Sequence, residues 1–340
     1  MDFNKEDILN EVERLTAETE IEKVIVTRTA NERIRIAASR PQPKMLFDEF
    51  WFENELCILF AGSNVGKSIL AVQIADSITK GYNIGEFKMH AEPQNVAYFD
   101  AELSDKQFQL RYTDEITKKI YQFDDKFFTQ ELDSPSGDSG DEILNAIIED
   151  IVKYEAKILI IDNLSYLDDD NEKAKRAIPL LKKLKALKKK YGLSILVLAH
   201  TPKRDESKPL HQNDLAGSKM LINLCDSAFA IGSSTQSNKD SQYRYVKQIK
   251  VRNAKQSFTS DNVCLFELKR QSLLLQFVFI DNVDEKDHLK EVTKKDREIE
   301  EVRILELKEQ GLSLRAIVDD DDVFCSHSTV KRILDKHNAV

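Results

Sequence analysis

A glycine-rich segment, residues 61–68, has the residue types and the spacing of a phosphate-binding loop. It separates an apolar run, residues 55–60, from a helical pattern, residues 69–79. The backbone N–H groups of such a loop and of the helix that follows it can surround phosphate oxygens. Lys67 can then reach the β and γ phosphates of a nucleotide, and the Ser68 hydroxyl can bind Mg²⁺. The residues of the segment are Ala61, Gly62, Ser63, Asn64, Val65, Gly66, Lys67 and Ser68.

Three polar residues at or just past the ends of apolar runs could serve the same chemistry. Asp162 could hold Mg²⁺ and its bound water. Glu102 could orient and deprotonate the water that attacks the γ-phosphate, a role for which Asp100 is the competing residue. His200 could hydrogen-bond the γ-phosphate, or it could be a satisfied histidine at a strand end. The alternative for the loop itself is a simple glycine-rich turn between a strand and a helix.

The elements that position these residues alternate between short apolar strands and amphipathic helices. This pattern predicts an α/β fold built from βαβ units around a buried, mainly parallel sheet, with ligands bound at the carboxyl edge. The predicted parallel strands are residues 55–60, 95–99, 157–161, 194–199 and 227–231. Three later β-rich runs are expected to extend the sheet with antiparallel strands, at residues 243–251, 263–270 and 273–280.

The chain of 340 residues favours one medium-sized domain and one small domain. We expect four parts along it. They are an N-terminal arm and linker at residues 1–45, an ATPase core at 46–282, a linker at 283–295 and a small all-α unit at 296–340.

The composition limits the class of protein. Hydrophobic residues make up 41% of the chain and charged residues 32%, which allows a packed core. No apolar run approaches the roughly 18 residues that span a bilayer, and the four cysteines form no CxxC pair. We therefore expect a cytoplasmic protein without a membrane partner. The net charge of −9 argues against a protein that coats nucleic acid, but it allows a local basic loop.

The order of these motifs resembles that of a known family. Residues 61–68 resemble a Walker A loop with Ala61 at the usual first glycine, and residues 158–162 resemble a Walker B strand. With Glu102 and His200 they resemble the RecA-like ATPases, and more closely the hexameric helicases typified by plasmid RepA and the DnaB type. The DnaB type usually has glutamine at the position of His200, which favours the RepA-like branch.

This resemblance covers residues 43–280. It implies a RecA-like fold, ATP and Mg²⁺ as cofactors, and assembly as a homo-hexamer. An N-terminal segment of about 45 residues is too short for the primase-interacting domain of the DnaB type. Such an arm could instead dock on a neighbouring subunit.

The resemblance also implies a catalytic role for two cationic residues. Lys250 and Arg252 match residues that these hexamers project into the nucleotide site of the neighbouring subunit. A guanidinium supplied in this way neutralises charge on the transferring phosphoryl group. The alternative is that Gln248, Lys250 and Arg252 form the solvated face of a strand.

A basic loop follows His200. By the same resemblance, Lys203, Arg204 and Lys208 lie where a hexamer lines its channel with loops that bind the phosphates of single-stranded DNA. An ordinary mobile surface loop is the alternative.

The last segment, residues 296–340, has the pattern of short amphipathic helices and resembles a helix-turn-helix unit. It contains 7 Lys or Arg and 11 Asp or Glu residues, a net charge of 7 − 11 = −4. The acidic run 319–322 would repel DNA phosphates, so a protein-docking unit is the alternative to a reader of duplex DNA. The residues that would face a major groove are Ser328, Lys331 and Arg332.

Two functional hypotheses follow. The first is a Mg²⁺–ATP-dependent motor acting on single-stranded DNA, as a replicative-type helicase of a plasmid or other mobile element. The second is an ATP-switched DNA-binding regulator or adaptor without unwinding activity, whose C-terminal unit binds duplex DNA or a protein. Stimulation of ATP turnover by single strands would distinguish the two.

Overall fold

The computed structural model describes residues 25–131, 140–163, 173–202, 204–215, 218–318, 320, 322–325 and 327–338. The chain contacts divide it into two units, Met1–Gln42 and Pro43–Val340. The described part of the first unit contains helix α2 (Ala30–Ala38), none of whose residues is buried. The Thr29 side chain accepts the N–H of Glu32 at 3.2 Å, which caps the start of this helix.

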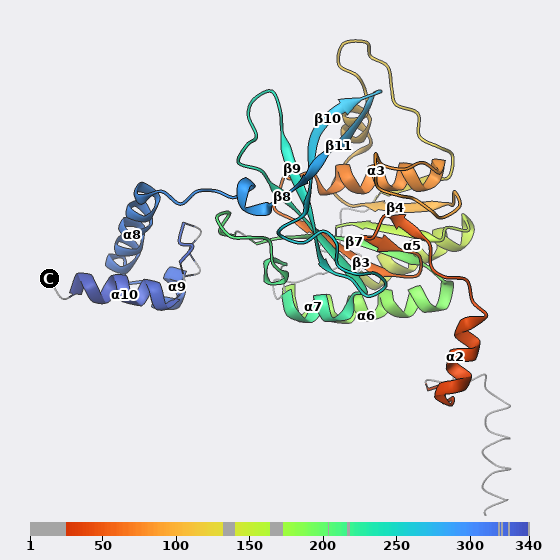
Figure 1. Cartoon of the computed structure of the whole chain (residues 1–340), viewed down its shortest axis with the longest axis horizontal. Coiled ribbons are helices and arrows are strands. Elements are labelled where there is room, and N and C mark those ends of the chain that lie inside the picture. Colours follow the sequence, from red (N-terminus) through yellow and green to blue (C-terminus); the bar gives the residue numbers. More distant parts are fainter. Residues whose placement is uncertain are drawn as a thin grey trace, which may run out of the picture. The chain divides into compact units, whose positions relative to one another are not determined.

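The second unit is built on a sheet that has nine strands among the described residues, in the order β11-β10-β9-β8-β3-β7-β6-β4-β5 (Figure 1). The six strands from β8 to β5 pair in parallel, and β9, β10 and β11 continue the sheet in antiparallel fashion. The predicted fold class is therefore confirmed. The strands are β3 (Leu56–Ala61), β4 (Val96–Asp100), β5 (Phe127–Glu131), β6 (Ile158–Asp162), β7 (Ser194–His200), β8 (Ser227–Ser233), β9 (Tyr243–Lys250), β10 (Val263–Gln271) and β11 (Leu274–Val283).

Helices cover both faces of this sheet, with α3 on one face and α6 and α7 on the other (Figure 1). Successive side chains of β3 point to opposite faces and are apolar on both, so each face needs a covering layer. Leu59 packs in the α3-side core and Ile58 in the core on the other face. The remaining elements of the core are two short strands, β1 (Met45–Phe47) and β2 (Trp51–Phe52), and helices α3 (Lys67–Lys80), α4 (Asp105–Arg111), α5 (Gly140–Lys153), α6 (Lys173–Tyr191), α7 (Ser218–Leu224), η2 (Gln212–Asp214) and η3 (Glu285–His288).

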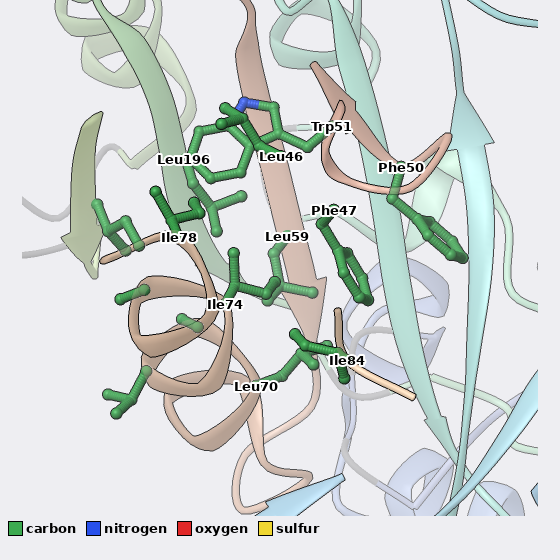
Figure 2. Close-up of a cluster of buried hydrophobic side chains, with 14 of the residues drawn as sticks. Leu46, Phe47, Phe50, Trp51, Leu59, Leu70, Ile74, Ile78, Ile84 and Leu196 are labelled. Atoms are coloured by element: carbon green, nitrogen blue, oxygen red, sulfur yellow. The ribbon is translucent and has the colours of Figure 1, made fainter. Parts of the chain in front are cut away.

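The α3-side core fixes the helix that begins at the glycine-rich loop. Leu70, Ile74 and Ile78 recur at helical spacing on α3 and pack against Leu59 of β3 and Leu196 of β7 (Figure 2). All five side chains have no measurable exposure. Burial of each such side chain contributes about 1.5–3 kcal/mol, so the start of α3 is held firmly at the sheet edge.

Three helices follow the sheet, α8 (Lys294–Glu309), α9 (Leu314–Val318) and α10 (His327–Asn338). They share a small core of their own, formed by Ile304, Leu307, Ile317, Val323, Val330 and Leu334. The helix α8 begins at Lys294, two residues before the predicted boundary, because Thr293 and Asp296 form a capping box there. None of the helices in the described part of the chain combines the length and apolar character needed to cross a membrane.

Candidate nucleotide-binding site

The glycine-rich loop joins the end of β3 to the start of α3, at the carboxyl edge of the parallel strands. Gly66 immediately precedes the helix and has a φ of 110°, a value that favours glycine. A Cβ atom on Gly66 would also lie 3.0 Å from the ring of Phe277. The helix start carries no side-chain cap, so the loop geometry suits an anion-binding turn.

Lys67 is the first residue of α3, and it is only 7% exposed. Its Nζ lies 3.2 Å from the Ala61 carbonyl oxygen, 3.1 Å from that of Gly62 and 3.3 Å from Nδ1 of His200. Burial lowers the pKa of Lys67, although Asp162 and Glu102 act in the opposite direction. The ammonium group thus bonds to uncharged atoms of the loop and is placed to accept an anion.

Asp162 ends β6 directly beside Asp100 of β4. It is 2% exposed and accepts the Tyr98 hydroxyl at 2.7 Å, and the Ser68 side chain acts to lower its pKa. Burial raises the pKa of Asp162 to about 6, so the charged form is costly without a nearby cation. A buried carboxylate in contact with a hydroxyl fits a Mg²⁺ site, because both supply the oxygen ligands that this ion prefers.

Glu102 and His200 meet at the same edge, joined by Asn163. The side-chain nitrogen of Asn163 donates to Glu102 and lies 2.9 Å from Nε2 of His200, whose distance to Glu102 is 3.5 Å. Asp100 is only 6% exposed and accepts the backbone N–H groups of Glu102 and Leu103, both at 2.9 Å. This geometry favours Glu102 over Asp100 as the group that can reach a water molecule.

Two residues of this site, Asn163 and Arg111, were not predicted from the sequence. Arg111 lines a cavity of about 390 Å³ together with Lys67, Ser68, Glu102 and His200. Its Nη1 atom is buried and makes no hydrogen bond to a described residue. The sequence feature that could have indicated Arg111 is its position nine residues after Glu102, at the end of the capped helix α4. A helix of this length spans about two turns from the strand edge. For Asn163 the signal was its place directly after Asp162.

Lys250 and Arg252 lie away from this cavity. Lys250 pairs with Ala228 at the start of β8, which is the amino edge of the parallel strands. Its Nζ donates to the carbonyl of Cys225 at 2.8 Å, and Nη1 of Arg252 lies 3.0 Å from Asp226. The Arg252 side chain is 47% exposed. The structure therefore does not bring either cation to the nucleotide site of its own chain.

The loop after His200 is folded against the rest of the core. Lys203 lies outside the described residues. Arg204 is 16% exposed and lies 3.4 Å from Asp214, so it differs from the solvent-facing cation expected from the sequence. Lys208 is 66% exposed and lies 2.8 Å from Asp205. Only Lys208 of the two described cations is therefore accessible to a DNA backbone.

The predicted DNA-facing residues of the C-terminal helices are Ser328, Lys331 and Arg332. All three are exposed on α10, whereas Val330 of the same helix is buried. Arg303 of α8 contacts Asp320 through two nitrogens, at 3.3 and 3.0 Å. This pair neutralises part of the acidic run that argued against DNA binding.

Known proteins share parts of these features. A family model described as an AAA domain matches residues 26–206, which include the glycine-rich loop, Glu102, Asp162 and His200 but neither Lys250 nor Arg252. No protein of curated function matches the chain. Among solved structures, the chain is similar to a KaiC-like protein from the hyperthermophilic archaeon Pyrococcus horikoshii OT3, with 15% identity and a TM-score of 0.45. The similarity covers 68% of this chain and 91% of that chain.

The raised pKa of Asp162 predicts a stability change that needs no ligand. Its value of about 6 exceeds the ordinary 3.8, so the free energy of unfolding should fall as the pH rises from 4 to 7. Asp162→Asn should therefore raise the unfolding free energy of the ligand-free protein at pH 8 by up to about 3 kcal/mol, and by much less at pH 4. Thermal unfolding followed by circular dichroism at both pH values measures the change.

Asp226→Asn is the matched control with the opposite sign. Burial would raise the pKa of Asp226, but the Leu56 N–H and Lys188 hold it below its ordinary value. This carboxylate stabilises the fold above pH 4, so its loss should lower the melting temperature at pH 8. A destabilised Asp162→Asn protein at pH 8 would contradict the conclusion that the charged form of Asp162 is costly in the ligand-free fold.

Proposed function

The chain belongs to the AAA domain family, and on this premise we propose that it is a Mg²⁺-dependent ATPase that works as a motor on single-stranded DNA. The observation that carries the ATPase proposal is one cavity lined by Lys67, Ser68, Glu102, Arg111 and His200. These residues come from α3, the loop after β4, helix α4 and the end of β7. They combine cations for phosphate oxygens with a carboxylate that can act on water.

The roles of the residues follow from their contacts. Lys67 would bind the β and γ phosphates in place of its present carbonyl partners, and Arg111 would add a second cation. Ser68 and Asp162 would hold Mg²⁺, which when bound neutralises charge on phosphate oxygens. Glu102 would orient and deprotonate the attacking water, held in place by Asn163.

His200 would serve as the contact between the nucleotide and the following loop. Its ring nitrogens face Lys67 on one side and Asn163 on the other, so it lies between the lysine that would bind phosphate and the amide that holds Glu102. It also ends β7, directly before the segment that contains Lys208. A change at the γ-phosphate could therefore move the start of that segment.

Assembly into a homo-hexamer is supported by the position of Arg252. The side chain lies at the edge opposite to its own nucleotide site, and nearly half of it is exposed. A neighbouring subunit could receive it, as the resemblance to the RepA and DnaB helicases implies. The same resemblance supports a replicative-type helicase of a plasmid or mobile element, with Lys208 contacting the strand.

The second candidate function is an ATP-switched regulator that binds duplex DNA without unwinding it. The observation that favours it is the exposed face of α10, which presents Ser328, Lys331 and Arg332 together. The Arg303–Asp320 contact reduces the repulsion that the acidic run would exert on phosphates. A motor could also use this helix to bind its DNA target.

Lys67→Ala and Glu102→Gln should separate binding from chemistry. Loss of the ammonium group of Lys67 should weaken ATP binding and lower turnover by about 10²–10³, because its charge acts on the phosphates directly. Glu102→Gln should keep ATP affinity within about threefold and lower turnover by about 10²–10⁴, because only water activation is lost. Steady-state hydrolysis and titration with a fluorescent ATP analogue measure both. Parental turnover in Glu102→Gln would exclude this residue as the base.

Mixing experiments should distinguish residues that act within one chain from those that act across an interface. Arg252→Ala should lower turnover by about a thousandfold, and mixing it with Glu102→Gln protein should restore activity. In a mixed assembly, some interfaces pair an intact Glu102 with an intact Arg252. Arg111→Ala is the matched control, since Arg111 and Glu102 line the same cavity of one chain and their mixture should show no rescue.

Equal behaviour of the two mixtures, under conditions of proven subunit exchange, would contradict the assignment of Arg252 to a neighbouring site.

DNA dependence should separate the two candidate functions. For a motor, single-stranded DNA should stimulate ATP turnover several-fold, and Lys208→Ala should lower the log–log salt slope of strand binding by about 0.7. For a regulator, duplex DNA should bind more tightly than single strands, and Lys331→Ala with Arg332→Ala should remove that preference. Lys290→Ala, another exposed lysine, serves as the control for a general loss of charge. Turnover indifferent to single strands would reject the motor.

A further inference from the structure

Arg244 of β9 is a buried cation beside the glycine-rich loop. It is 8% exposed. It lies on the same face of β9 as Val246, which packs in the α3-side core. Its Nε donates to the carbonyl oxygen of Val65 at 3.0 Å. Its other nitrogens donate to the Tyr243 carbonyl at 2.8 Å and to the Gln242 side chain at 3.1 Å.

These three hydrogen bonds all go to uncharged oxygen atoms. A buried guanidinium usually faces a carboxylate, because removal of its charge from water is otherwise costly. Burial lowers the pKa of Arg244, in keeping with that cost. An apolar side chain, such as that of Val246 on the same face, would pack here without the cost of burying a charge. The fold therefore bears a cost at Arg244 that packing alone does not require.

The contact with Val65 has a geometric consequence for the loop. In a trans peptide unit the C=O and the N–H point in opposite directions. The carbonyl of Val65 and the N–H of Gly66 belong to one such unit. When Arg244 holds the carbonyl toward β9, the Gly66 N–H is turned the other way, toward the inside of the loop.

This orientation needs an external support because Gly66 is a glycine. Its φ of 110° is accessible to glycine, but glycine also adopts many other backbone conformations at little cost. The Val65–Gly66 peptide could therefore rotate and present its carbonyl oxygen to a phosphate, which would repel it. A charge-assisted hydrogen bond to that carbonyl opposes such a rotation.

We propose that Arg244 is a positioning residue for the nucleotide, which fixes the Val65–Gly66 peptide with its N–H directed at the phosphates. The inference rests on the proposed ATPase function and extends it to a residue in the antiparallel part of the sheet. It predicts an effect on nucleotide affinity rather than on the chemical step, because the bond acts equally on bound ATP and ADP.

Replacement of Arg244 tests the proposal. Arg244→Met, similar in length and apolar, should raise the Kd for both ATP and ADP by about 10- to 100-fold, the usual effect of losing a hydrogen bond to a charged group. The kcat at saturating ATP should change less than about threefold. Arg244→Lys keeps the charge but not the fixed geometry of the guanidinium, so its Kd should lie between those of the parent and of Arg244→Met. Isothermal titration with each nucleotide and steady-state kinetics give the two constants.

Gln242→Ala is the matched control, because it removes another partner of Arg244 and leaves the bond to Val65. Its Kd should stay within about twofold of the parental value. Should Arg244→Met fail to fold, Arg244→Lys decides the question, with a Kd at least threefold above the parent expected. An unchanged Kd in the folded variants, or a fall in kcat alone, would overturn the proposal. A parental protein that binds no ATP would instead refute the ATPase function itself.

Discussion

The cost of burying charge at the carboxyl edge of the sheet is the constraint on which the site depends. Lys67 and Arg244 are buried with hydrogen bonds to uncharged atoms, and Arg111 has a buried nitrogen without a hydrogen bond to a described residue. Lys188 and Lys247, two other largely buried cations of the core, face the carboxylates of Asp226 and Glu285. Lys67 and Arg111 line the same cavity, so an anion with several negative oxygens would compensate both of these cations there.

The strand β9 connects this site to the opposite edge of the sheet. It carries Arg244 at one end, in contact with the glycine-rich loop, and Lys250 at the other, near the start of β8. An extended strand rises about 3.3 Å per residue, so these two positions lie roughly 20 Å apart. β8 pairs with β9 from Arg244 to Lys250, whereas β10 pairs with it only from Tyr243 to Val246. The glycine-rich loop therefore lies at one end of β9, and the proposed interface cation Arg252 follows two residues after its other end.

The sequence predicted the buried strands well because they are apolar throughout. The predicted run 55–60 and the observed β3 differ by one residue at each end, and the predicted run 194–199 differs from β7 only at His200. Edge strand β5 (Phe127–Glu131) was missed, since its half-exposed residues Phe-Phe-Thr-Gln-Glu show no clear period. Among site residues, strand-end positions were predictable, whereas Arg111 required knowing how α4 packs beside the loop. The pattern of residue types does not contain that orientation.

The loop after His200 shows why charge in a sequence does not by itself predict a DNA contact. Its basic residues suggested a solvated segment, yet Leu210 within it is 3% exposed. The backbone N–H of Leu210 donates to Glu285 at 2.6 Å, and its carbonyl accepts Lys247 at 2.7 Å. Glu285 is fully buried and lies 2.6 Å from Lys247, so removal of either partner would leave an unpaired buried charge at a cost of about 3–5 kcal/mol. Because Glu285 lies between β11 and α8, this contact joins the loop that starts at His200 to the segment that leads into the C-terminal helices.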